Sequence, residues 1–221
     1  ELEAVNSTKD KFFTIIAHDL KNPFSTVISI SDILLQRFDK FEKEKTIEYI
    51  EQINRYSRNA FNLLENLLQW ARSQTGSLKI NFRRAKLSDI VTEVFELFTV
   101  TAQQKEIVLE KSVDEGLYAY IDVDMVTTVI RNLDSNALRF SPVNEKIRVE
   151  AVESGDMVTI KVSDNGKGIE PERAESLFRI DVRQSFAEDE DGMQGSGFGL
   201  IICKEFVSKN GGDIWVDSKV N

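Results

Sequence analysis

The first 75 residues contain no glycine, and they carry the periodic apolar pattern of long helices. In residues 3–37 and again in 43–73, apolar side chains recur at steps of three and four, which places them on one helical face. The charged segment 38–45 is expected to hold a turn, so the two helices form an antiparallel hairpin. Pro23 lacks a backbone N–H, and we expect the first helix to kink or loosen there.

The apolar stripes of this hairpin are too wide for two helices to cover each other. Packing two copies into a four-helix bundle would bury them, so the sequence predicts a homodimer. The alternative is that the stripes pack against the rest of the same chain. The stripe positions are Phe12, Phe13, Ile16, Leu20, Phe24, Val27, Ile28, Ser31, Leu34 and Leu35, then Ile47, Ile50, Ile53, Ser57, Ala60, Phe61, Leu64, Leu67, Leu68 and Ala71.

The chain changes character after residue 75, where glycines become frequent and strand-like runs alternate with helical ones. The segment Gln74–Ser77 has the composition of a linker, so we expect a helical hairpin over 1–75 and a second domain over 76–221. The mixed elements predict a two-layer α/β sandwich. Strands are expected near 79–83, 108–113, 118–121, 147–152, 157–163 and 213–216, and helices near 87–105, 124–140 and 199–210.

Charge and cysteine content exclude several functions. The net charge of -9 argues against a nucleic-acid partner, because phosphate binding needs a basic face. Cys203, the single cysteine, stands in an apolar run and is expected to be a buried hydrophobe. A single cysteine allows no intrachain disulfide, so we expect this fragment to be cytoplasmic. No apolar run approaches the length that spans a bilayer, and no signal peptide is visible. A membrane anchor upstream of Glu1, which would place the full-length protein in the inner membrane, is left open.

His18 is the only histidine, so any histidine chemistry must occur there. It lies one position off the apolar stripe and is expected to reach solvent, where a neutral imidazole is a nucleophile. Asp19 could hold the Nδ1–H and leave Nε2 free to react. Asn22 lies one turn on, where its amide could position a water or a phosphoryl oxygen. A histidine on an ordinary helix surface remains the alternative.

Two glycine-rich boxes follow in the second domain. The first box, 164–168, reads Asp-Asn-Gly-Lys-Gly and follows a predicted strand, so its carboxylate could accept a hydrogen bond from adenine. The second box, 195–200, reads Gly-Ser-Gly-Phe-Gly-Leu and opens a helix, where backbone N–H groups can bind phosphate. Neither box fits the Rossmann or P-loop pattern. The acidic residues 180–194 between them are expected to form a mobile lid.

Asn132 and Asn136 are spaced by four on a predicted helix, so they share one face. Amide oxygens there can ligate Mg²⁺ together with waters and nucleotide phosphates. Arg139 lies one turn on, where it could meet a phosphate. The alternative for the two asparagines is an ordinary solvated face.

The order of these boxes resembles the sensor histidine kinases of two-component systems over nearly the whole chain. The resemblance implies a dimeric four-helix bundle followed by a Bergerat-type (histidine kinase/gyrase/Hsp90-like) sandwich, with ATP and Mg²⁺ as cofactors. It also implies autophosphorylation and transfer to an aspartate of a response regulator receiver domain. By position, the resemblance implies that His18 is the phosphoacceptor, that Asp19 is its acidic partner, and that Asn22 acts in dephosphorylation of the regulator.

The resemblance also assigns the nucleotide site. The asparagine box consists of Asn132, Asn136, Arg139 and Phe140, with Asn136 as the Mg²⁺ ligand, and the adenine site consists of Asp164, Gly166 and Gly168. Phe178 matches the phenylalanine box, and the second glycine box consists of Gly195, Gly197, Gly199 and Leu200.

The chain departs from the family pattern at several positions. Asp134 stands where the family has an apolar or small residue, and we expect it either to repel phosphate or to face water. The family also supplies at least one more strand, so we expect the catalytic domain to be truncated at its C-terminus. Two rival readings remain. One is a gyrase- or Hsp90-type ATP hydrolase, which would carry Glu at Asn132, and the other is a non-catalytic nucleotide-binding module.

Overall fold

The computed structural model describes residues 2–74, 80–179 and 198–220. These residues form two compact units, one before the predicted linker and one after it. Within the described ranges, no helix has both the length and the apolar character that crossing a membrane requires.

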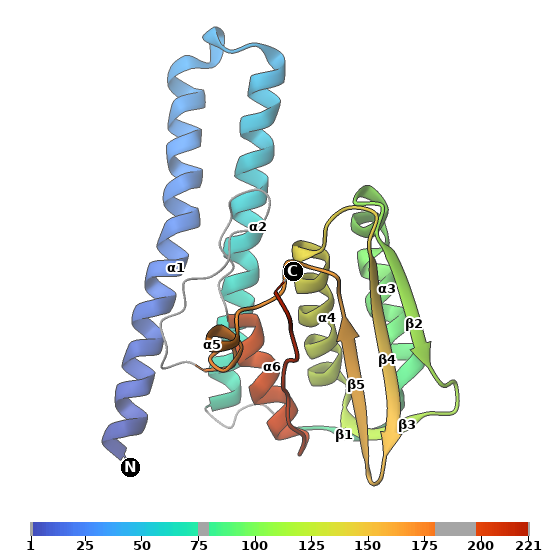
Figure 1. Ribbon diagram of the computed structural model, residues 1–221. Helices are drawn as coiled ribbons and strands as arrows, with labels where there is room; N and C mark the ends of the chain where they lie inside the picture. The colour runs from blue at the N-terminus through green and yellow to red at the C-terminus, as the bar shows by residue number, and fades with distance from the viewer. Residues whose placement is uncertain (1, 75–79, 180–197, 221) are drawn as a thin grey trace. The chain divides into compact units, whose positions relative to one another are not determined.

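The first unit is a helical hairpin, as the sequence predicts (Figure 1). Helix α1 (Leu2–Arg37) leads through the short 3-10 helix η1 (Phe38–Lys40) to α2 (Lys43–Gln74). Pro23 lies inside α1 without ending it. The helix therefore tolerates the one backbone hydrogen bond that proline cannot donate, and no break separates His18 from the rest of the hairpin.

The hairpin buries only part of its apolar surface. Ile30, Ala60 and Leu63 are buried, whereas Phe24 and Ile28 are 52% and 59% exposed. Among the hairpin side chains that the structure describes, the other exposed large apolar ones are Ile33, Leu35, Phe38, Ile47, Ile50, Phe61, Leu64 and Leu68. Exposed apolar side chains in such numbers are typical of a surface that another set of helices covers.

The described residues of the second unit form two sheets. Strand β1 (Phe82–Lys86) pairs antiparallel with β3 (Tyr118–Asp122). In the other sheet, β4 (Lys146–Ser154) lies between β2 (Val108–Val113), to which it is parallel, and β5 (Met157–Ser163), to which it is antiparallel.

Two strand predictions were wrong. The first strand begins at Phe82 and not near 79, and residues 213–216 follow α6 without being a strand. The short helix α5 (Pro171–Ala174) was not predicted.

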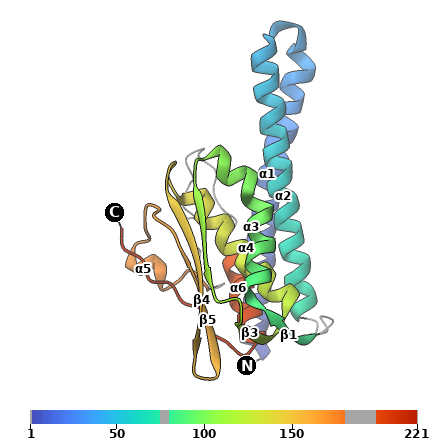
Figure 2. The same ribbon diagram turned by 90° about the vertical axis from the view of Figure 1, so that its right-hand side faces the viewer.

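Helices α3 (Leu87–Gln104) and α4 (Val123–Phe140) pack on one face of the larger sheet and make the predicted two-layer α/β sandwich (Figure 2). Helix α6 (Phe198–Lys209) packs against α4. The apolar faces of α3 and α4 follow the helical period, and these two helices bury a core with the inward residues of β4. The core comprises Leu87, Ile90, Val91, Val94, Ile130, Val149 and Ala151.

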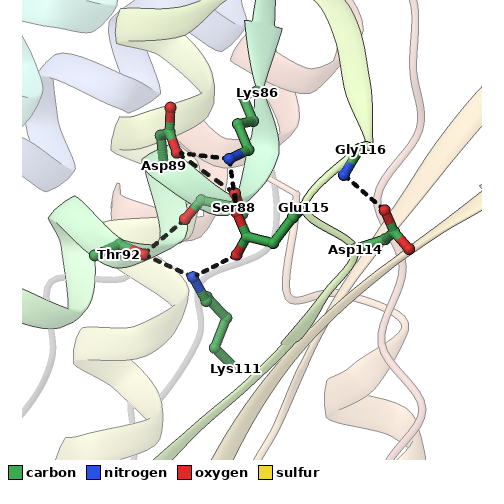
Figure 3. A network of polar contacts seen from close by, with 8 residues as sticks. All are labelled: Lys86, Ser88, Asp89, Thr92, Lys111, Asp114, Glu115 and Gly116. Atoms are coloured by element: carbon green, nitrogen blue, oxygen red, sulfur yellow. Dashed lines mark hydrogen bonds and ion pairs between the residues drawn. The ribbon is translucent and has the colours of Figure 1, made fainter.

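A polar network joins the start of α3 to the turn between β2 and β3 (Figure 3). Glu115 accepts hydrogen bonds from Lys86 Nζ at 2.6 Å and Ser88 Oγ at 3.1 Å, and it lies 3.4 Å from Lys111 Nζ. The bond from Lys86 is the main reason why the pKa of Glu115 falls to about 2. The Glu115 side chain is 66% exposed, so solvent screens its ion pairs and the network fixes the turn more than it stabilises the fold.

Helices α3 and α6 end in the same way. In α3, the N–H of Ile107 donates to Ala102 O at 2.8 Å and the N–H of Glu106 to Gln103 O at 3.1 Å. This is a Schellman motif, which places its C′ residue in the left-handed region. Gly211 fills that position after α6 with φ of 79°, whereas Glu106 fills it after α3 with φ of 56°.

Replacing Glu106 by Gly should raise the free energy of unfolding by about 1 kcal/mol, because only glycine adopts positive φ without a steric penalty. Urea denaturation measures the change. The matched control is Gly211→Ala, which should destabilise by a similar amount, since no atom lies within 4 Å of the added Cβ and only backbone conformation changes. A Glu106→Gly variant less stable than the parent would contradict this account.

Candidate functional site

Helix α4 carries the asparagine box. It begins where the Asp122 carboxylate accepts from Met125 N at 3.1 Å, a side-chain N-cap. Asn132 and Asn136 are both half-buried on one face, as predicted. Asn132 Nδ2 donates to Thr128 O at 3.0 Å, which fixes the amide and leaves its Oδ1 free to face a neighbour.

The first glycine box lies against the C-terminal end of α4. A Cβ at Gly166 would stand 2.9 Å from Phe140 O and 2.7 Å from Asp164 Oδ1, so only glycine fits there. Asp164 Oδ1 accepts from the Gly166 N–H at 2.8 Å, which closes a tight turn. The second carboxylate oxygen remains to accept a hydrogen bond from an exocyclic amine.

Gly168 ends the same box in a left-handed conformation, with φ of 75°. A Cβ there would lie 2.0 Å from Lys219 O, so the C-terminal segment passes directly over this glycine. The next residue, Ile169, donates its N–H to Ser218 Oγ at 3.0 Å. The shape of the first box therefore depends on residues 218–219 at the other end of the unit.

The second glycine box meets α4 through Gly199. A Cβ at Gly199 would lie 2.9 Å from Asn132 Oδ1, which is tighter than a carbon–oxygen contact allows. Leu200 follows half-buried on α6. The two boxes therefore reach the same helix about two turns apart, at Asn132 and at Phe140.

Replacing Gly199 by Ala should lower the affinity for ATP about tenfold while leaving the fold as stable or slightly more stable. Alanine favours a helix over glycine by about 1 kcal/mol, but its methyl group displaces the Asn132 amide. Titration with a fluorescent ATP analogue, together with thermal unfolding, separates the two effects. In an Asn132→Ala background the same substitution should cost no affinity. An equal loss in both backgrounds would exclude the proposed contact.

Two cations approach the Phe140 ring at the end of α4. The Arg139 guanidinium lies 5.3 Å and the Lys167 ammonium 5.5 Å from the ring centroid. Both distances suit cation–π contacts. These contacts bring one positive charge from the asparagine box and one from the first glycine box to the same ring, which is an arrangement suited to a polyphosphate.

Asp134 is buried, so the expectation that it faces water was wrong. It is 0% exposed and lies on the core face of α4, one turn from buried Ile130 and Leu138. Within the described residues, neither of its carboxylate oxygens has a hydrogen-bond partner. Burial raises the pKa of this carboxyl to about 7.

The described residues fit a nucleotide with its metal ion. The missing side chains at Gly166 and Gly199 let both glycine boxes approach α4 closely, at Phe140 and at Asn132. The amide oxygens of Asn132 and Asn136 are of the kind that Mg²⁺ accepts. Arg139 and Lys167 supply positive charge beside them.

Several predicted site residues lie away from α4 or outside the described residues. His18 and Asp19 lie in α1 of the first unit, and their side chains fall outside the described residues. Asn22, one turn on, is exposed. Phe178 is half-buried in the turn after α5. Gly195, Gly197 and the expected lid over 180–194 lie outside the described residues. The described parts of the predicted boxes lie on α4, after β5 and at the start of α6.

Two polar residues escaped the sequence analysis. Asp122 caps α4 and is 5% exposed, and Asn210 at the end of α6 accepts from the Asp122 N–H at 2.8 Å. An aspartate just before a predicted helix is an N-cap signal that could have identified the first. Cys203 is buried as predicted, and burial raises the pKa of its thiol to about 12, which makes it unreactive.

Two family models match the chain. Residues 8–76 match the His Kinase A (phospho-acceptor) domain, and residues 121–221 match the histidine kinase-, DNA gyrase B-, and HSP90-like ATPase. The second match begins at the end of β3, so β1, α3 and β2 precede it.

The chain is also similar to individual kinases. It is 26% identical over 216 residues to the adaptive-response sensory kinase SasA of Microcystis aeruginosa, which covers 95% of this chain and 56% of that protein. The chain thus spans about half the length of the curated relatives it matches first.

Two solved structures have the same fold. Histidine kinase ThkA in complex with response regulator TrrA matches with a TM-score of 0.73 at 19% identity, over 98% of this chain and 60% of that chain. Full-length ShkA in complex with AMPPNP matches with a TM-score of 0.64 at 19% identity, over 96% and 43% of the two chains.

Proposed function

Starting from the premise that this chain belongs to the sensor histidine kinase family, we propose that it transfers the γ-phosphoryl group of ATP to its own His18. The observation that carries the proposal is the meeting of both glycine boxes on α4. Helix α4 carries the amide oxygens of Asn132 and Asn136. The cations Arg139 and Lys167 lie near its Phe140, and Gly166 and Gly199 of the two boxes contact it.

The nucleotide is proposed to lie along this face of α4. The free oxygen of Asp164 accepts from the adenine amine, while Arg139 and Lys167 offset phosphate charge. Asn136, with Asn132 beside it, would hold the Mg²⁺. A bound Mg²⁺ would offset negative charge on the phosphoryl group.

His18 supplies the nucleophile. Its Nε2 forms a bond to the γ-phosphorus as the bond to the bridging oxygen breaks, and ADP leaves. Asp19 holds the Nδ1–H and stabilises the positive charge that develops on the ring. Positioning and electrostatics account for most of the rate in such transfers, which is why His18 and the α4 face can belong to different units.

The partners are proposed from the same premises. The exposed apolar residues of the hairpin, such as Phe24 and Ile28, support a homodimer through a four-helix bundle. ThkA, which shares the fold, has been solved with a response regulator. A receiver-domain aspartate is therefore the proposed second acceptor, with Asn22 placed one turn from His18 for the reverse, dephosphorylating reaction.

A hydrolase of the gyrase or Hsp90 type is the weaker candidate. Such an enzyme needs a general base to activate water, and Asn132 cannot accept a proton. The Asn132 Nδ2 donates a hydrogen bond to Thr128 O, which fixes the orientation of the amide so that its Oδ1 faces Gly199.

The test is incubation of the whole chain with γ-labelled ATP and Mg²⁺. Label that is lost in acid and retained in base identifies phosphohistidine. Label released only as free phosphate would establish a hydrolase, and bound nucleotide without either product would establish a binding module.

A further inference from the structure

The chain enters the ATP-binding unit beside the start of α4. Helix α2 ends at Gln74, and six residues, 75–80, connect it to Asn81. Phe82 then pairs with Asp122, so the incoming segment and the start of α4 share one end of the β1–β3 sheet. No loop separates β3 from α4.

One buried carboxylate joins these two parts of the chain. Asp122 Oδ2 accepts from the Asn81 N–H at 2.8 Å, and Asp122 Oδ1 accepts from the Met125 N–H at 3.1 Å. Asp122 is 5% exposed, and bonds to an ionised acceptor in such a place are about twice as strong as neutral ones. A displacement of Asn81 therefore acts on the first turn of α4.

The same point is tied to α6. Asn210 Oδ1 accepts from the Asp122 N–H at 2.8 Å, and Asn210 Nδ2 donates to Phe206 O at 2.8 Å. This bond holds the end of α6 against the start of α4. The start of α6 meets the middle of α4, where Gly199 contacts Asn132, about 15 Å further along α4 at 1.5 Å per residue.

We propose that Asp122 is a positioning residue that couples the segment arriving from the helical hairpin to the nucleotide face of α4. Its two oxygens have separate tasks: Oδ1 caps the helix, and Oδ2 holds the incoming backbone. The hydrogen bond from the Asn81 N–H to Asp122 Oδ2 is called the tie below. Because α4 and α6 are rigid over this length, a shift at the tie moves Asn132 and Gly199 together. The autophosphorylation readout of this coupling rests on the proposed function, whereas the nucleotide-binding readout does not require the transfer.

The tie can be removed at its donor without touching Asp122. Asn81→Pro deletes the N–H, and Asn81→Ala is the matched control that keeps it. We expect the proline variant to autophosphorylate about fivefold more slowly or worse at saturating ATP, a typical size for coupling between sites. Affinity for a non-hydrolysable ATP analogue should also fall about fivefold in the proline variant, because coupling between two binding equilibria acts by the same factor in both directions. Equal rates for the two variants would overturn the proposal.

The acceptor provides a second, independent variant. Asp122→Ser keeps an N-cap oxygen for Met125 but cannot reach Asn81, and Asp124→Ser removes an exposed carboxylate from the same turn as a control. Asp122→Ser should slow the reaction as much as Asn81→Pro does, and the double variant should be no slower than either. Additive effects would show that the two residues act independently and would overturn the tie. Thermal unfolding verifies that each variant is folded.

Amide hydrogen exchange separates this proposal from the kinase assignment. Coupling is reciprocal, so the ATP analogue should increase protection of residues 80–84 in the parent chain and not in Asn81→Pro. Protection without any label on His18 would support the coupling and overturn the proposed transfer. Label on His18 with unchanged protection of residues 80–84 would overturn the coupling and leave the kinase assignment standing.

Discussion

Replacing His18 by Gln should abolish incorporation of acid-labile, base-stable phosphate from γ-labelled ATP. The chain has no other histidine, so no second imidazole can accept the phosphoryl group. Glutamine keeps a polar side chain of similar length, and its amide nitrogen is not a nucleophile. Affinity for an ATP analogue should be unchanged, because the nucleotide residues lie in the other unit.

Asn22→Ala is the matched control for this experiment. It truncates an exposed polar residue one turn away on the same helix and should retain autophosphorylation. It should instead slow removal of phosphate from a phosphorylated receiver domain. Retained base-stable label in His18→Gln would refute the proposed acceptor, and loss of label in Asn22→Ala would show that damage to the helix accounts for the effect.

Replacing Asp134 by Leu should raise the free energy of unfolding at pH 8 by about 2–4 kcal/mol. The carboxyl is fully buried and has no hydrogen-bond partner in the described parts of the chain, so an ionised form there costs several kcal/mol. Leucine restores an apolar side chain between the Ile130 and Leu138 turns of the core. Urea denaturation at pH 5 and pH 8 measures the gain.

The pH dependence follows from the pKa of Asp134, which burial raises to about 7, against an unfolded value near 3.8. Between about pH 4 and pH 7 the folded chain holds a proton that the unfolded chain releases, so the parent loses stability as the pH rises. At about 1.4 kcal/mol for each pH unit, the loss approaches 4 kcal/mol and is complete above pH 7. The advantage of Asp134→Leu should therefore shrink as the pH falls toward 4.

Asp134→Asn is the matched control for this variant. It abolishes the titration but leaves a buried amide without partners, so it should lack the pH dependence and gain less stability than leucine. A parent chain equally stable at pH 5 and pH 8 would contradict the buried, unpartnered position.

Most of the fold was accessible from periodicity. The helix over 87–105 and the strands over 108–113 and 157–163 were placed within a residue, because their apolar residues face one core and their ends carry strong turn signals. The first strand was misplaced, since Lys79–Arg83 has no such signal. The pairing of β1 with β3 that selects its register is a long-range contact. The strand over 213–216 failed similarly, because no partner strand pairs with it in the described residues.

The site was predicted as separate boxes, and the sequence could not say how they meet. Glycine spacing identified Gly166 and Gly199, yet only the fold shows that one faces Phe140 and the other Asn132. Asp134 was misjudged for the same reason. A carboxylate two residues from each of two polar site residues was expected near phosphate or water, but the helical period places position 134 on the opposite face, toward the sheet.

The order of strands in the larger sheet has a consequence for biosynthesis. Strand β2 pairs in parallel with β4, and β3 and the whole of α4 lie between them in the chain. During translation β2 must wait for all of these residues before its partner exists. Helix α4 is therefore synthesised before the β2–β4 pair that supports it can form. Helix α6, which carries Gly199, is synthesised after α4 and after this strand pair.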